Sequence, residues 1–363
     1  YHPHMMGKTA QHVHAGLAGM YIIEDENSQA LDLPKDYGVN DIPLIVQDRS
    51  FTDGRMNHYA VTKDVIMDGL REDTIVVNGT VDALHSVPQG WVRLRLLNGS
   101  NARFYRFRFD NRAPFFKIAT EGGFLNHPVK VQSIEMAPGE RNEILVDLSN
   151  GSKTTLVADL LPEDPDDSDR WDSNTPQVNI VELRVDPTIR ASGALPARLN
   201  DIAFFDRGDA TRIRTISLEM EVRRDRVRRG DRGRRSRRNA IQRETAATAA
   251  GHEKTFAING RPMAMNHINE RVNKGEVEIW RITGQRKPHP FHLHGASFQI
   301  LTQNGARPAK ADRGWKDVVV VGSEISEIIV RFDHEATDRF PYMFHCHVLE
   351  HEDHGMMGQF TVE

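Results

Sequence analysis

The segment GWVRLRLLNGS, residues 90–100, shows the pattern that decides the fold. It is short, it alternates apolar with charged side chains, and glycine and asparagine bound it, which is typical of a β-strand between turns. Segments of the same kind recur along the chain: IPLIVQDRSF (42–51), DTIVVNG (73–79), FYRFRFDN (104–111), NEILVDLS (142–149) and VNIVELRVD (178–186). Convincing helical patterns are few. The sequence therefore predicts an all-β protein.

An internal repeat divides the chain. VVNGTVD, GWVRLRLLNGS and EMAPGERNEILVDLSNG recur in the same order as AINGRPM, GEVEIWRITGQ and VGSEISEIIVRFDHEA. A repeat of this length indicates two copies of one structural unit, so we expect one β-sandwich over residues 31–190 and another over 191–363. GLAGMYIIEDE (16–26) looks like the closing strand of an earlier sandwich. Residues 1–30 are therefore expected to be the C-terminal remnant of that first domain.

Composition excludes several classes of partner. The 363 residues contain 47 Lys and Arg against 51 Asp and Glu, a near-neutral balance that gives no overall attraction to nucleic acid or to membranes. No apolar run approaches the ~20 residues needed to span a bilayer. We therefore expect no nucleic-acid partner and no membrane span. The single cysteine allows no internal disulfide, so it does not identify the compartment.

Two segments have biased composition. Residues 161–176 are acidic and contain proline, and residues 223–243 are crowded with arginine. Self-repulsion favours solvated surface insertions for both. Binding of an anion, a nucleic acid or a polymer is the functional alternative for the arginine-rich segment.

Two short stretches near the C-terminus concentrate histidine. HPFHLHG (289–295) and HCHVLEHEDHGMM (345–357) hold seven of the 17 histidines and the only cysteine. Successive side chains of a strand leave opposite faces, so Cys346 points one way while His345 and His347 point the other. One strand is thus predicted to serve two metal sites. Ordinary surface or core histidines would not cluster in this way.

The cysteine face offers a defined ligand set. A thiolate with two imidazoles and a weak thioether is the trigonal copper site used for one-electron transfer. Cys346, His289, His351 and Met356 supply that set. The sequence therefore predicts a thiolate copper site.

The opposite face offers only imidazoles. His345 and His347, with His292 and His294 facing them, could bind copper, zinc, iron or nickel. Copper is favoured because the backbone links these histidines directly to the cysteine, which provides a short path for electrons.

With these motifs, the chain resembles the bacterial multicopper oxidases, in the branch of copper-efflux oxidases and laccase-like enzymes. Stretches that carry the resemblance, in order, are YHPHMMGKT, GLAGMYIIED, LPKDYGVNDIPLIVQDRSF, GWVRLRLLNGSNAR, ASGALP, GWKDVVV and HCHVLEHEDHGMM. The resemblance implies tandem cupredoxin-type Greek-key β-sandwiches and a periplasmic location. It also implies one-electron oxidation of a reducing substrate coupled to four-electron reduction of dioxygen to water.

The resemblance implies four copper ions. Type 1 copper would be bound by His289, Cys346 and His351 with Met356 as axial ligand, and type 2 copper by His292. The type 3 pair would be shared among His2, His4, His294, His345 and His347. Glu352 stands where the family has a carboxylate that delivers protons to reduced oxygen, and a solvated loop acid is the alternative.

The chain departs from the family pattern in its histidine pairs. The family uses four His-X-His pairs, whereas this chain has three, and an upstream HWHG-like motif is lacking. His12 and His14 form another such pair, but the family has no ligands at that point and we expect none here. An N-terminal fragment or a neighbouring subunit would complete the cluster; otherwise the site is incomplete. The domain at 31–190 should bind no catalytic copper, because its histidines are scattered.

Substrate preference follows from a second departure. The copper-efflux branch covers its type 1 site with a methionine-rich segment, whereas this chain has the arginine-rich segment, with Gln285, Lys287 and Ala264 near the site. The leading expectation is a laccase-like oxidase of phenols or aromatic amines, with Cys346 and Glu352 as the catalytic residues. The alternatives are a cuprous oxidase for copper tolerance and a non-catalytic copper-binding or electron-transfer cupredoxin array or inactive fragment.

Overall fold

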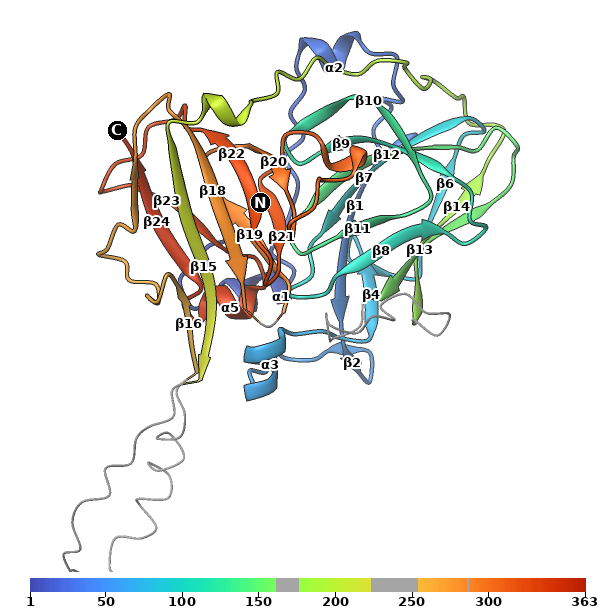
Figure 1. Ribbon diagram of the computed structural model, residues 1–363. Helices are drawn as coiled ribbons and strands as arrows, with labels where there is room; N and C mark the ends of the chain where they lie inside the picture. Colours follow the sequence, from blue (N-terminus) through green and yellow to red (C-terminus); the bar gives the residue numbers. More distant parts are fainter. Residues whose placement is uncertain (161–175, 223–253, 286) are drawn as a thin grey trace, which may run out of the picture.

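A computed structural model describes residues 1–160, 176–222, 254–285 and 287–363 (Figure 1). The two segments of biased composition, 161–176 and 223–243, lie outside these residues except for Pro176. The described part of the chain is built mainly of strands, so the prediction of an all-β protein is confirmed.

The first β-sandwich contains the strands of residues 41–185. They are β1 (Asp41–Arg49), β4 (Thr74–Val77), β5 (Thr80–Val81), β6 (Ala83–Val87), β7 (Trp91–Asn98), β8 (Tyr105–Phe109), β9 (Phe115–Thr120), β10 (Gly123–Val131), β11 (Ile134–Met136), β12 (Arg141–Asp147), β13 (Thr154–Leu160) and β14 (Gln177–Val185). One sheet has the order β10-β9-β12-β7-β1-β4-β5, and the other β11-β8-β13-β14-β6. A small hairpin of β2 (Phe51–Thr52) and β3 (Arg55–Met56) projects from it.

The second β-sandwich contains the strands of residues 212–362. They are β15 (Arg212–Val222), β16 (Lys254–Ile258), β17 (Glu270–Val272), β18 (Val277–Gly284), β19 (His289–Leu293), β20 (Phe298–Thr302), β21 (Val318–Val321), β22 (Ser326–Arg331), β23 (Tyr342–Cys346) and β24 (Met357–Val362). Its sheets have the orders β16-β15-β18-β22-β20 and β17-β24-β23-β19-β21. Figure 1 shows the two sandwiches side by side.

The repeat in the sequence corresponds to a repeated strand order. In the first sandwich β4-β1-β7-β12-β9 are neighbours, and β16-β15-β18-β22-β20 are their counterparts in the second. In both sheets the second and third of these strands pair in parallel, as β1 with β7 and β15 with β18. The opposing sheets also correspond, β11-β8-β13-β14-β6 with β21-β19-β23-β24-β17.

Each sandwich encloses its own apolar core. The first packs large side chains such as Phe107 and Phe115 between its sheets, and the second packs Trp280, Phe344 and Phe360. All are almost fully buried. Alternating apolar positions on facing sheets account for both cores, since burial of such side chains is the main favourable term in folding.

The helices are short and lie between the sandwiches or at their edges. They are α1 (Thr9–His14), α2 (Glu26–Ala30), α3 (Lys63–Asp68) and α5 (Leu349–Asp353), with 3₁₀ turns η1 (Arg207–Asp209) and η2 (Lys310–Asp312). No side chain of its own N-cap residue caps α1. Instead, the Asp353 carboxylate accepts hydrogen bonds from the backbone N–H groups of Thr9 and Ala10, at 3.0 and 2.9 Å. This contact ties the N-terminal segment to α5.

The segment GLAGMYIIEDE differs from expectation. Residues 17–25 form no strand, and they pair with no strand among the described residues. Tyr21 and Ile23 are 81% and 88% exposed. None of the helices among the described residues has the length and apolar character to cross a membrane.

Candidate metal centres

The structure brings together the predicted thiolate group. His289, Cys346 and His351 are buried, and the Cys346 Sγ lies 3.4 Å from the His289 Nδ1 and 3.6 Å from the His351 Nδ1. The outer nitrogen of each ring is held by a backbone carbonyl. His289 Nε2 lies 3.0 Å from the Gln285 carbonyl oxygen, and His351 Nε2 lies 3.1 Å from that of Met67.

These outer hydrogen bonds fix the tautomer. Because a carbonyl oxygen only accepts, Nε2 must carry the proton in both rings, which leaves the Nδ1 lone pairs directed toward the thiol. Metal-binding histidines are commonly oriented by such a bond. Two lone pairs and a sulfur thus converge on one point in a buried site.

Neighbouring strands build this group. β19 pairs with β23, and Phe291 stands opposite Cys346. The chain then turns through α5, which carries His351. The buried Met356 accepts from the Cys346 N–H with its carbonyl, at 3.1 Å, and donates from its own N–H to the His351 carbonyl, at 3.0 Å. The predicted axial residue therefore lies directly beside the thiolate group.

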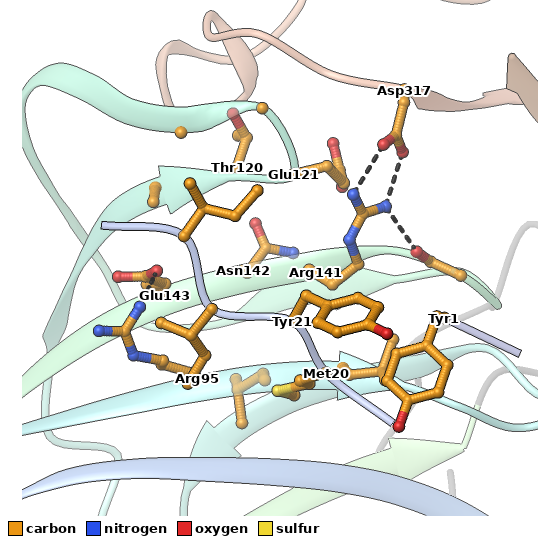
Figure 2. A pocket seen from close by; sticks show the side chains of 18 of the residues that line it. Tyr1, Met20, Tyr21, Arg95, Thr120, Glu121, Arg141, Asn142, Glu143 and Asp317 are labelled. Atoms are coloured by element: carbon orange, nitrogen blue, oxygen red, sulfur yellow. Dashed lines mark hydrogen bonds and ion pairs between the residues drawn. The ribbon is translucent and has the colours of Figure 1, made fainter. Parts of the chain in front are cut away.

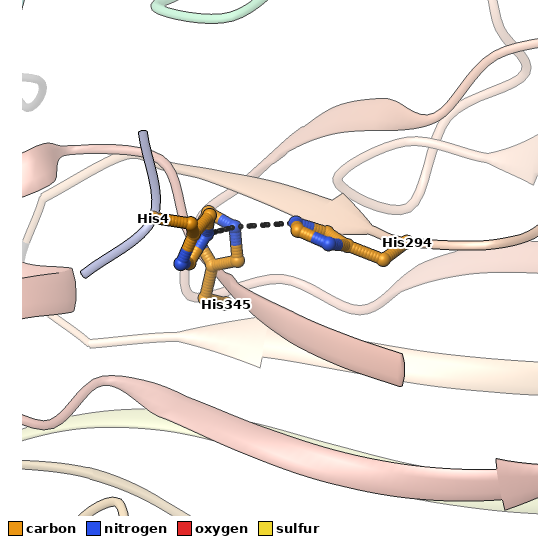
Figure 3. A group of neighbouring side chains, drawn as sticks. All are labelled: His4, His294 and His345. Atoms are coloured by element: carbon orange, nitrogen blue, oxygen red, sulfur yellow. Dashed lines mark hydrogen bonds between the residues drawn. The ribbon is translucent and has the colours of Figure 1, made fainter. Parts of the chain in front are cut away.

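The second group lies on the opposite face of the same strands. His4, His294 and His345 meet through their Nε2 atoms, with His345 Nε2 3.3 Å from that of His4 and 3.1 Å from that of His294 (Figure 3). His345 Nδ1 lies 3.0 Å from the Cys346 carbonyl, so its Nε2 carries a lone pair. The alternation predicted for β23 therefore holds in the geometry.

The remaining predicted histidines surround this group. The ring centre of His347 lies 5.4 Å from that of His2 and 5.7 Å from that of His292. The ring of His2 is stacked on that of His4, at 5.5 Å. His347 Nδ1 is buried and has no hydrogen-bond partner among the described residues. All three histidine pairs therefore contribute to one imidazole cluster.

Burial keeps these imidazoles neutral. It lowers the pKa of His289 to about 4, and burial together with the neighbouring histidines lowers that of His4 to about 4. The pKa values of His345, His347 and His351 lie well below the ordinary value for the same reason. A neutral imidazole is the form that binds a metal ion.

Glu352 is buried beside the imidazole cluster. Its two carboxylate oxygens lie 3.5 Å from His4 Nδ1 and 3.1 Å from His345 Nδ1. Neither oxygen has a hydrogen-bond partner among the described residues. Burial raises its pKa well above the ordinary value. Burial therefore favours the protonated form of Glu352, and the residue is not the solvated loop acid considered as the alternative.

A cavity of about 1080 Å³ opens onto the imidazole cluster. His2, His4, His292, His294 and His347 line it. Its other walls come from the N-terminal segment, including Tyr1 and Tyr21, and from the first sandwich and Asp317 (Figure 2). The imidazole cluster therefore borders an open space, whereas the thiolate group is closed.

Other histidines are engaged elsewhere. His14 Nε2 lies 3.0 Å from a Glu72 oxygen, and His85 and His127 contact the carbonyl oxygens of Gly38 and Ala197. Neither metal-compatible group found among the described residues includes any of them.

Two residues outside the predicted ligand set, Asp317 and Arg141, support the site. Asp317 lies in the quoted stretch GWKDVVV, and its carbonyl oxygen is 2.9 Å from His292 Nδ1. Its carboxylate accepts two hydrogen bonds from Arg141, at 2.6 and 2.7 Å. The two residues are 176 positions apart, and no local pattern reports such a pairing.

Comparisons with known proteins agree with this geometry. Multicopper oxidase family models match residues 46–163 and 236–363. The cell division protein FtsP of Xenorhabdus nematophila is 35% identical over 100% of this chain and 69% of its own length. The multicopper oxidase mco of Staphylococcus haemolyticus is 34% identical over 100% of this chain and 67% of its own.

Solved structures show the same likeness. The structure of the laccase-like multicopper oxidase CueO from Ochrobactrum sp. is 36% identical, with a TM-score of 0.82, and the match covers 100% of this chain and 76% of that one. The chain therefore belongs to the multicopper oxidase family, an oxidoreductase family that uses copper. The expected cupredoxin-type sandwiches are confirmed.

The residues present fit copper. The thiolate group joins one sulfur and two Nδ1 lone pairs, and the backbone of Met356 is hydrogen-bonded to Cys346 and His351. These residue types supply the thiolate, imidazole and thioether donors of an electron-transfer copper site. The imidazole cluster has three converging Nε2 atoms and an orphaned His347 nitrogen. Orphaned buried nitrogens are costly unless a bound group satisfies them.

Proposed function

We propose that the protein is a laccase-like oxidase that couples one-electron oxidation of phenols or aromatic amines to four-electron reduction of dioxygen to water. The observation that carries the proposal is the position of β23. Cys346 on this strand belongs to the thiolate group, and the adjacent His345 belongs to the imidazole cluster. One peptide unit thus joins the point of electron entry to the point of oxygen reduction.

The ligand assignment follows the two groups. His289, Cys346, His351 and Met356 would hold type 1 copper. His292 would hold type 2 copper, and His2, His4, His294, His345 and His347 the type 3 pair. Bound copper would supply one-electron oxidation at the first site and dioxygen reduction at the second.

Within this proposal, Glu352 delivers protons. Its position beside His4 and His345, its burial and its raised pKa support that role. Cys346 carries electrons away from the substrate. The closed environment of the thiolate group excludes water from the thiol, since His289, Cys346 and His351 are all buried.

We propose that residues 31–190 and 191–363 are the second and third cupredoxin domains and that residues 1–30 belong to the first. A fourth His-X-His pair, from an N-terminal fragment or a neighbouring subunit, would complete the cluster. The cavity beside the cluster and the exposed Tyr21 and Ile23 support a partner at this face. A periplasmic location is part of the same proposal and rests on the family resemblance.

The residues near the thiolate group favour an organic substrate over a cuprous ion. Cuprous ions prefer thioether and thiolate ligands, whereas Gln285 and Lys287 stand before His289. Lys287 forms an ion pair with Asp68 of α3, a helix whose Met67 carbonyl contacts His351. A cover that is poor in methionine should leave this edge more open to an organic donor, and electrons would enter there.

Oxygen uptake by the copper-loaded protein tests the proposal. We expect oxygen uptake in the presence of a phenolic donor and none without a donor. Cys346→Ser should abolish this uptake. Faster uptake with cuprous ion than with phenol would favour the cuprous oxidase. Bound copper without uptake from any donor would favour the non-catalytic copper-binding array.

A further inference from the structure

The described part of the first sandwich contributes no histidine to either metal-compatible group, yet it touches the imidazole cluster twice. The contacts come from the turn 137–140, which joins β11 to β12, and from Arg141, the first residue of β12. Gly139 packs against the ring of His347, and Arg141 reaches His292 through Asp317.

The contact through Arg141 has two steps. Arg141 donates from both terminal nitrogens to the two carboxylate oxygens of Asp317. Such a bidentate pair fixes orientation as well as distance. The Asp317 carbonyl oxygen then accepts from His292 Nδ1 at 2.9 Å, and one carboxylate oxygen lies 3.5 Å from the same nitrogen. His292 Nε2 therefore keeps its lone pair for a metal ion.

Figure 2 shows the guanidinium of Arg141 directed at the carboxylate of Asp317. Asp317 thus bridges the two sandwiches, since its carboxylate accepts from Arg141 of the first and its carbonyl oxygen accepts from His292 of the second.

The residue before Asp317 strengthens the junction. Lys316 is buried, and its Nζ lies 2.9 Å from a Glu121 oxygen and 3.0 Å from a Glu140 oxygen, both in the first sandwich. The adjacent residues Lys316 and Asp317 are therefore both bound by side chains of the first sandwich. The segment that carries the His292 acceptor cannot move without breaking these bonds.

We infer that Arg141 is a positioning residue for metal binding: by holding the Asp317 carboxylate it fixes the segment whose carbonyl oxygen orients His292. The inference rests on the proposed function, since it needs His292 to hold copper. The first sandwich then orients His292, a metal ligand that belongs to the second sandwich.

Copper titration of the metal-free protein tests this inference. The wild-type protein, Arg141→Leu, Arg141→Lys and Asp317→Asn would be compared with the matched control Lys117→Met. The control breaks another ion pair between the sandwiches, Lys117 with Asp312 at 2.8 Å, that contacts no histidine. Thermal unfolding and circular dichroism of each variant separate loss of fold from loss of orientation.

We expect Arg141→Leu to weaken binding of the copper held by His292 by about 10- to 100-fold, the usual effect of removing a partner that orients a metal ligand. Its electron paramagnetic resonance spectrum should change, while the visible absorption of the thiolate copper stays. The copper affinity of Asp317→Asn should lie between those of the wild type and Arg141→Leu. Arg141→Lys should retain part of the affinity that Arg141→Leu loses. Lys117→Met should bind copper as the wild type does.

Two results would overturn the inference alone: wild-type affinity and spectrum in Arg141→Leu, or equal losses in Arg141→Leu and Lys117→Met. A wild-type protein that binds no copper would overturn the proposed function, and this inference with it. The metal content of the wild-type protein therefore distinguishes the two failures.

Discussion

The two β-sandwiches share a strand order but not a chemistry. In the second, the adjacent strands β19 and β23 carry His289, His292, His345 and Cys346. The corresponding strands of the first, β8 and β13, carry Arg106, Arg108 and Asp159, which form an ion-pair cluster. Equivalent positions of one fold thus hold metal ligands in one copy and a salt-bridge cluster in the other. Fold alone does not determine function here.

The two sandwiches also contribute differently to the two metal groups. The second sandwich builds the thiolate group almost entirely by itself. The imidazole cluster combines the N-terminal segment with the second sandwich, and the first sandwich backs it at Gly139 and Arg141. We therefore expect the thiolate group to tolerate changes at the junction that the imidazole cluster does not.

The largest effect should come from Cys346→Ser, because this variant leaves the second sandwich without a thiolate ligand, like the first. We expect complete loss of the intense visible absorption of the oxidised copper protein, because thiolate-to-copper charge transfer requires the sulfur. Copper bound by the imidazole cluster should remain. An unchanged visible band in this variant would show that the thiolate group is not the type 1 site.

The next largest effect should come from Lys316→Met at the junction. The change leaves Glu121 and Glu140 buried without their cation, which should lower the free energy of unfolding by about 3–5 kcal/mol. Denaturant unfolding measures it. Lys117→Met, whose partner Asp312 is partly exposed, should lose less. Equal losses of unfolding free energy in the two variants would show that the Lys316 ion pairs stabilise the junction no more than the Lys117 ion pair does.

The same cluster predicts a pH dependence. Burial outweighs the attraction of Lys316 and raises the pKa of Glu121 to about 7, from an ordinary value of 4.5. The folded state therefore binds more protons than the unfolded state between these values, and the contribution to stability present at low pH is lost as the pH rises through about 7.

Glu121→Gln should flatten this part of the stability profile, because glutamine does not titrate but can still accept a hydrogen bond from Lys316. Unfolding free energies of both proteins across the window provide the measurement. Parallel profiles for the wild type and the variant would contradict the assignment of the slope to Glu121.

A smaller effect is expected for Gly139→Ala. Gly139 has a φ of 83°, and an added Cβ would lie 2.7 Å from the His347 ring. The backbone conformation alone should cost about 1–2 kcal/mol. Copper binding by the imidazole cluster should weaken while the visible absorption stays. Equal loss of copper from both groups would show that the contact acts only through global stability.

Much of this arrangement can be predicted from the sequence. Alternation with a period of two residues predicts the strands, including β7 and β12. The repeated motifs predict the repeated strand order. Alternation along β23 also separates Cys346 from His345 and His347, because it depends only on neighbouring residues.

Other features have no local signature. The Arg141–Asp317 contact joins distant strands, and the Met67 carbonyl that orients His351 is a backbone group that any residue could supply. Residues 17–25 have the composition of a strand, but strand pairing requires a neighbour that composition does not report. Local sequence patterns therefore do not predict these long-range contacts.

Anomalous diffraction at the copper absorption edge, from crystals of the copper-loaded protein, tests the central claim most directly. The claim is that the second sandwich, together with the N-terminal segment, holds both metal groups, whereas the described part of the first sandwich holds none. We predict a peak among Cys346 Sγ, His289 Nδ1 and His351 Nδ1, and further density among the Nε2 atoms of His4, His294 and His345. No peak beside Cys346, or a peak bound by His85 or His127 in the first sandwich, would contradict it.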